Sequence, residues 1–131
     1  MKIFNVIIRL VLEYAAPTFH SMLSNEQTSA IERVQKQATK IIFGWDCEYQ
    51  DLIDSGKIEP LSARRDNLTL NFAKKVEKSD RSNKWFPRHE EYDYNLRQQK
   101  KYAESFSRTE RLRKSPVFHM RRLLNNEETE N

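Results

Sequence analysis

The sequence predicts an all-α protein, built as a small helical bundle followed by an irregular basic C-terminal arm. Its 131 residues include two glycines, whereas hairpins and β-sandwiches need glycine at turn positions with positive φ. Apolar side chains recur at helical spacing over the first eighty residues. The 37% hydrophobic and 32% charged content fits a modest core with a long solvated part. We therefore expect a bundle over residues 1–80 and an extended, basic and aromatic arm with an acidic tail over 81–131.

The first helix is expected over residues 2–15. Its polar residues lie three, four and four positions apart and form one stripe: Lys2, Asn5, Arg9 and Glu13. Nearly every other side chain on it is apolar, so this helix should be covered on most sides. We expect it to end at Pro17, because proline cannot continue a helix.

The second helix has clear start and stop signals. Ser24 and Gln27 have capping-box spacing, and Gly44 is a natural residue to follow a helix C-terminus. Its outer face carries the basic stripe Arg33, Lys36 and Lys40.

A short helix is expected over residues 49–56, ended by Gly56, and a fourth helix after Pro60 with Ser62 as its N-cap. The helical spacing predicts a core formed by Ile7, Leu10, Val11, Tyr14, Ile31, Val34, Ala38, Ile41, Ile42, Leu52, Ile53, Leu61, Leu68, Phe72 and Val76.

The arm combines positive charge with aromatic residues. Residues 97–122 contain nine basic and two acidic side chains. Tyr102, Phe106 and Phe118 lie among the basic residues and are candidates for stacking on nucleobases. Alternatively, the arm packs on the acidic tail or on the bundle itself.

Several kinds of chemistry lack the residues that they need. Cys47 and the three histidines have no metal-ligand spacing, so no metal or other cofactor is expected. No glycine-rich phosphate loop, paired aspartates or activated nucleophile is present. We therefore expect no catalytic residue, no enzymatic activity and no small-molecule substrate.

The first apolar run is interrupted by charge and is shorter than the ~20 residues that span a bilayer. No membrane association is expected. One cysteine excludes an internal disulfide and favours an intracellular protein, cytoplasmic or nuclear.

Contact with a polyanion remains as a candidate function, and the net charge of +4 favours it weakly. A basic stripe on one helix is more often simply a solvated face. The candidate phosphate contacts in the bundle and the arm are Arg33, Lys36, Lys40, Arg64, Lys74, Lys75, Lys100, Lys101, Arg108, Arg111, Arg113 and Lys114.

Five blocks follow one another in an order that resembles one protein family. Three of them are the first-helix block with Ile8-Arg9, Leu12-Glu13-Tyr14 and Pro17, then Ile31-Glu32-Arg33-Val34-Gln35-Lys36, then Arg64-Arg65-Asp66-Asn67-Leu68. The segments "WFP" and "RTERLRKSPVFHMRRLLN" complete the series. Together they resemble the region C-terminal to the palm in non-LTR (LINE-type) retrotransposon reverse transcriptases, which are RNA-directed DNA polymerases of transposable elements.

The resemblance implies a helical, thumb-like element that helps to hold a template–primer duplex of RNA or DNA. It adds Arg65 to the candidate phosphate contacts. The polymerase aspartates of the family lie in the palm and match no position here, so the resemblance implies a non-catalytic fragment. Phe19 stands where the family usually has tryptophan. The pair Thr39-Lys40 stands where the family often has a small residue followed by a basic or an aliphatic one.

Two readings stay open. As a polymerase fragment, the chain is expected to cover its apolar first helix with the missing palm domain or by self-association. The alternative is a free-standing small helical module that binds nucleic acid or protein and has no enzymatic activity.

Overall fold

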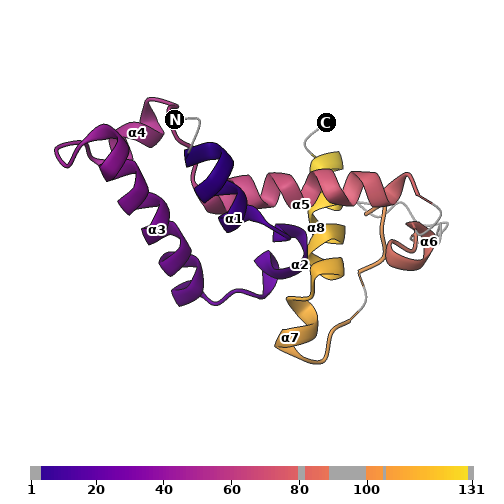
Figure 1. Ribbon diagram of the computed structural model, residues 1–131. Coiled ribbons are helices and arrows are strands. Elements are labelled where there is room, and N and C mark those ends of the chain that lie inside the picture. Colours follow the sequence, from indigo (N-terminus) through magenta and orange to yellow (C-terminus); the bar gives the residue numbers. More distant parts are fainter. Residues whose placement is uncertain (1–3, 80–81, 89–99, 105, 130–131) are drawn as a thin grey trace. The chain divides into compact units, whose positions relative to one another are not determined.

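A computed structural model describes residues 4–79, 82–88, 100–104 and 106–129 (Figure 1). Within these ranges every named element is helical, and an isolated antiparallel bridge joins Arg88 to Tyr102. The predicted all-α class is confirmed. The chain divides into two compact units, Met1–Asn67 and Leu68–Asn131. The boundary predicted at residues 80 and 81 falls outside the described ranges and stays a prediction.

Unit 1 begins with an unbroken helical stretch over residues 4–13, π-helical up to Arg9 and α-helical after it, and two short segments follow. Ala15, at φ 54°, adopts a left-handed conformation that interrupts the helix. Pro17 lies inside the next helix, where its missing N–H is not needed. The helix therefore ends close to the predicted residue 15, but Pro17 does not end it, because the left-handed Ala15 lies two residues earlier. The segments are the π-helical η1 (Phe4–Arg9), α1 (Leu10–Glu13), α2 (Ala16–Phe19) and the 3₁₀ turn η2 (His20–Met22).

Helix α3 (Asn25–Phe43) has the predicted ends. The Gln27 backbone N–H donates to the Ser24 hydroxyl over 3.2 Å, and the Ser24 N–H donates to the Gln27 side chain over 2.9 Å. This reciprocal pair confirms the capping box. Gly44 ends the helix at φ 99°, and its N–H donates to the Lys40 carbonyl.

Helix α4 (Tyr49–Asp54) is followed by Gly56 at φ 68°. Helix α5 (Leu61–Glu77) begins before Ser62, so the predicted N-cap is wrong. The side chain of Glu32 satisfies the Leu61 N–H instead, over 3.2 Å. A carboxylate at this position also interacts favourably with the positive end of the helix dipole.

The described part of the expected arm contains three helices: α6 (Ser82–Trp85), α7 (Glu110–Arg113) and α8 (Pro116–Thr129). The sequence analysis did not predict the fourteen-residue α8, and an irregular arm is wrong for this segment. Pro116 suits the first turn of a helix, and the His119 N–H makes an early helical bond to the Ser115 carbonyl.

The hydrophobic core of unit 2 brings the arm together with the second half of α5. It consists of Ala73, Phe86, Tyr102, Met120 and Leu124, all buried. The rings of Phe86 and Tyr102 are tilted by 50°, with their centroids 5.6 Å apart, a favourable aromatic geometry. The arm is thus part of a core, and the aromatic Tyr102 is not available for stacking on a base.

Tyr102 is also fixed by polar contacts. Its hydroxyl donates to the Glu77 carboxylate, and burial followed by this hydrogen bond raises the pKa of Tyr102 to about 12. The Asn125 side chain accepts a hydrogen bond from the Tyr102 N–H at 3.0 Å and donates to the Tyr102 carbonyl at 3.2 Å. A buried Arg121 donates to the carbonyls of Trp85 and Ala103. Polar residues of α8 therefore stabilise the segments that carry the core.

The interior of unit 1 contains more polar groups than the sequence predicts. Beside apolar residues such as Leu52 and Leu61, it buries Glu13, Gln35, Thr39 and Arg65.

Of the fifteen residues predicted for the core, across both units, three are buried: Ala38, Leu52 and Leu61. Four are half-buried: Ile31, Ile53, Leu68 and Val76. The prediction is wrong for eight exposed ones: Ile7, Leu10, Val11, Tyr14, Val34, Ile41, Ile42 and Phe72.

Candidate nucleic-acid interface

The thirteen candidate phosphate contacts fall into three groups. Six form ion pairs with carboxylates within their own unit: Arg64, Lys74, Lys100, Lys101, Arg113 and Lys114. Arg65 is buried. Six others are exposed and have no carboxylate partner among the described residues: Arg33, Lys36, Lys40, Lys75, Arg108 and Arg111.

The largest set of exposed, unneutralised candidates on one element lies on α3. Arg33, Lys36 and Lys40 are spaced i, i+3 and i+7, so they line one face over about 10 Å of helix. The opposite face of α3 buries Gln35, Ala38 and Thr39. The predicted basic stripe is therefore present on the solvent side.

The ammonium groups of two of these residues, Lys36 and Lys40, lie over aromatic rings. The Lys36 ammonium lies 5.1 Å from the centroid of the Tyr49 ring, and the Lys40 ammonium lies 5.9 Å from that of Trp45. Cation–π contacts of this kind orient an ammonium without neutralising it. Both lysines are exposed, which a phosphate contact requires.

A hydrogen-bond network on the buried side of α3 fixes this helix so that its basic stripe faces the solvent. Tyr49 donates its hydroxyl proton to Glu32 on α3, and Gln35 donates to the Tyr49 hydroxyl at 2.8 Å and to the Glu59 carbonyl at 3.0 Å. Burial, followed by the bond to Glu32, raises the pKa of Tyr49 above its ordinary value. Because Glu32 also accepts from the Leu61 N–H, the network joins α3 to α4 and to the start of α5.

Arg64 and Arg65 take structural positions. Arg64 donates to the buried carboxylate of Glu13, which also pairs with Arg9 at 3.2 Å. Burial lowers the pKa of Arg65, while the carboxylates of Glu32, Asp66 and Glu13 act in the opposite direction. The burial of Arg65 does not fit the predicted phosphate contact, because a guanidinium in this interior does not reach a ligand at the surface.

The candidates in unit 2 are mostly neutralised. Lys74 pairs with Glu127, and Glu110 pairs with both Arg113 and Lys114 on α7. Glu104 pairs with Lys100 at 2.8 Å. Lys101 pairs with Glu77 at 2.9 Å, and the pKa of Glu77 is lowered by its hydrogen bonds from Lys101 and Tyr102. Exposed charge remains at Lys75, Arg108 and Arg111.

The other two aromatic residues of the arm that were predicted to stack on nucleobases, Phe106 and Phe118, differ in exposure. Phe106 is 89% exposed. Phe118 is half-buried, with the Arg121 guanidinium 5.2 Å from its centroid. Trp45, which the sequence analysis did not single out, is 78% exposed beside the α3 stripe. Its place directly after the predicted stop at Gly44 was the available signal.

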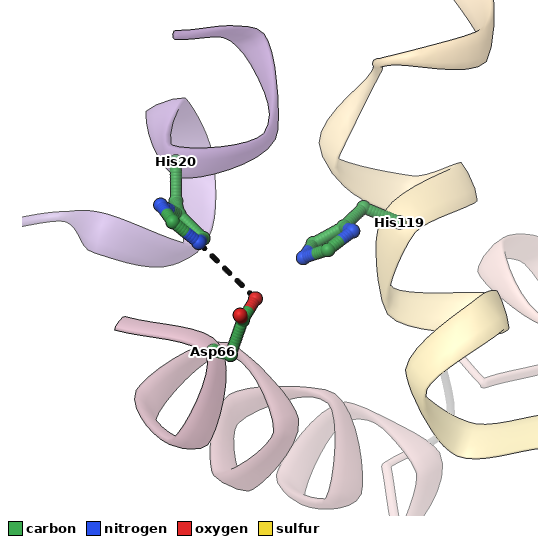
Figure 2. Close-up of side chains that lie close together, drawn as sticks. All are labelled: His20, Asp66 and His119. Carbon is green, nitrogen blue, oxygen red and sulfur yellow. Dashed lines mark hydrogen bonds and ion pairs between the residues drawn. The ribbon is translucent and has the colours of Figure 1, made fainter. Parts of the chain in front are cut away.

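His20 has a polar partner in unit 1. Its Nε2 donates to Oδ1 of Asp66 at 3.1 Å, and Figure 2 shows the two side chains meeting from η2 and α5. His119, also drawn there, belongs to α8 of unit 2. The hydrogen bond ties η2 to α5 within unit 1.

Among the described helices, none combines the length and apolar content needed to cross a bilayer. Comparisons of the chain with protein-family models, with curated proteins and with solved structures gave no match.

Proposed function

We propose that this chain binds the phosphate backbone of a nucleic-acid duplex through the outer face of α3, as a thumb-like, non-catalytic segment of a non-LTR reverse transcriptase. The observation that carries the proposal is the stripe Arg33, Lys36 and Lys40, which is exposed and has no carboxylate partner among the described residues. Such a row offers phosphates several contacts without first breaking an ion pair. The ligand class is a template–primer duplex, met inside the cell in the cytoplasm or the nucleus.

Contacts between the resembling blocks support this role. Glu13 of the first block binds Arg64 of the third. Glu32 of the second block accepts from the Leu61 N–H at the start of α5. These acidic residues therefore stabilise unit 1, and Arg33 and Lys36 of the second block remain on its surface. The proposal assigns no catalytic residue to the chain.

Removing the stripe should flatten the salt dependence of binding. We expect the triple variant Arg33→Gln, Lys36→Gln, Lys40→Gln to bind a short RNA–DNA hybrid duplex with a slope of log K against log salt that is shallower by about 2–3, because each lost phosphate contact removes roughly 0.9. Fluorescence anisotropy over a range of salt concentrations measures the slope. Circular dichroism verifies that the helices are retained.

The matched control removes three charges that are already paired: Lys100→Gln, Arg113→Gln, Lys114→Gln. It changes the net charge equally and should leave the slope close to that of the parent. Equal flattening in the two triple variants would mean that overall charge, and not the α3 stripe, determines binding. A parent protein without salt-dependent binding would contradict the proposed function itself.

A second candidate function, self-association, rests on the first helical segments. Ile7, Leu10, Val11 and Tyr14 are spaced i, i+3, i+4 and i+7 and are all exposed, Val11 by 74% and Tyr14 by 81%. The charges of this region are directed inward, since Glu13 is buried between two arginines. We propose that a second copy of the chain covers this apolar stripe, because two uncharged surfaces meet without like-charge repulsion.

Self-association should depend on the centre of the apolar stripe. We expect the parent chain to show a concentration-dependent dimer in sedimentation equilibrium, and Leu10→Ser with Val11→Ser to be monomeric at the same concentrations. Ile41→Ser with Ile42→Ser, which makes two equally drastic changes at neighbouring exposed positions of α3, is the control and should still dimerise. A monomeric parent would rule out the second copy and leave a polymerase palm domain as the cover.

A further inference from the structure

Trp45 is a large aromatic residue that is exposed to solvent next to the α3 stripe. The indole follows Gly44, beyond the C-terminal end of α3, and 78% of its surface is accessible. Tryptophan offers more apolar area than almost any other side chain, and burying it is strongly favourable. Its place beside the candidate binding face makes Trp45 a candidate for a ligand contact.

The positive charge beside Trp45 indicates which class of ligand the indole would contact. The Lys40 ammonium lies over the ring, 5.9 Å from its centroid, and belongs to the α3 stripe. An apolar protein partner that covered the indole would also remove this ammonium from water with no described carboxylate to pair with it, which is costly. A nucleotide avoids this desolvation cost, because its phosphate forms an ion pair with the ammonium while its base stacks on the ring.

The other aromatic ring that contacts a lysine of the stripe, that of Tyr49, is not equivalent. Tyr49 also holds a lysine over its ring, but the ring is half-buried and its hydroxyl is bonded to Glu32 and Gln35. It is a structural member of the network behind α3. Trp45 is therefore the residue of this face that is open to a base.

We propose that Trp45 is a stacking platform for one unpaired nucleobase at the end of the α3 stripe. Bases inside a duplex are stacked on their neighbours, so the base that Trp45 receives comes from a single-stranded extension. The inference rests on the proposed function, since the stripe supplies the phosphate contacts. It adds a preference for a duplex that continues into a single strand over a blunt one.

The test compares a blunt RNA–DNA hybrid with the same hybrid carrying a single-stranded extension. We expect the parent to bind the extended hybrid about tenfold more tightly, in line with the stacking of one base on an aromatic ring. Trp45→Leu, which keeps an apolar side chain but no π-face, should lose this preference. Trp45→Phe should keep most of it. Phe106→Leu removes an exposed ring from unit 2 and serves as the matched control, with an unchanged preference.

The outcomes separate the two proposals. If the parent binds both hybrids equally, or if Trp45→Leu keeps the preference, the stacking platform is wrong while the phosphate-binding stripe stands. Equal loss in Trp45→Phe and Trp45→Leu also overturns it, because a phenyl ring is sufficient for stacking. If neither hybrid shows salt-dependent binding, the proposed function fails and the inference fails with it.

Discussion

Replacing Phe86 with alanine is expected to destabilise unit 2 by about 3–5 kcal/mol. The side chain has no exposed surface and contacts the ring of Tyr102 within a core of five buried residues. A small domain has a total stability of about 5–15 kcal/mol. This one substitution should therefore remove a large part of the stability of unit 2.

Urea denaturation followed by far-ultraviolet circular dichroism measures this loss. Phe106→Ala is the matched control, since it removes the same ring from an 89% exposed position of the same unit. It should change stability by less than about 0.5 kcal/mol. A comparable loss in both variants, or a loss below about 1 kcal/mol for Phe86→Ala, would contradict the described core.

Replacing Glu32 with alanine is expected to destabilise unit 1 by about 2–3 kcal/mol. The substitution removes the acceptor for the Tyr49 hydroxyl and for the Leu61 N–H, and it removes a carboxylate that favours the charged form of Arg65. Helices α3, α4 and α5 would lose two of the bonds that join them, while those of Gln35 to Tyr49 and Glu59 remain. Chemical denaturation measures the change, and Gln37→Ala, on the exposed face of the same helix, is the control.

A double-mutant cycle isolates the bond between Glu32 and Tyr49. Glu32→Ala, Tyr49→Phe and the double variant should give a coupling energy of about 0.5–3 kcal/mol, as found for directly bonded side chains. Additive effects would mean that the hydroxyl and the carboxylate contribute independently. The network would then not account for the way in which α3 presents its basic face.

Local signals in the sequence predicted the ends of α3 well. The capping box at Ser24 and Gln27 and the stop at Gly44 each depend on residues a few positions apart. The interior of the same helix could not be predicted from its apolar spacing. Gln35 is buried because its partners, Tyr49 and Glu59, come from later segments of the chain.

Helix α8 was missed for a related reason. Its buried Met120 and Leu124 have helical spacing, but Arg121 and Asn125 lie beside them and make the segment look solvated. Both polar residues are buried because they bond to backbone groups of residues 85, 102 and 103. Such partners are known only once the chain is folded.

Part of the candidate interface was predictable. Helical spacing identified the stripe Arg33, Lys36 and Lys40, whose exposure agrees with that expectation. Sequence could not separate free cations from paired ones, because a partner such as Glu13 lies 51 positions from Arg64. For the same reason it did not show that Arg65 is buried or that Trp45 is exposed.

The polar interior of unit 1 has a thermodynamic consequence. Unfolding exposes buried apolar surface, which raises the heat capacity, and buried polar surface, which lowers it. Because unit 1 buries Glu13, Gln35, Thr39 and Arg65 while Val11, Tyr14 and Ile41 already face water, the two contributions should offset each other more than in an ordinary domain. Its stability curve is therefore shallow, and the free energy of unfolding changes little between cold and warm conditions.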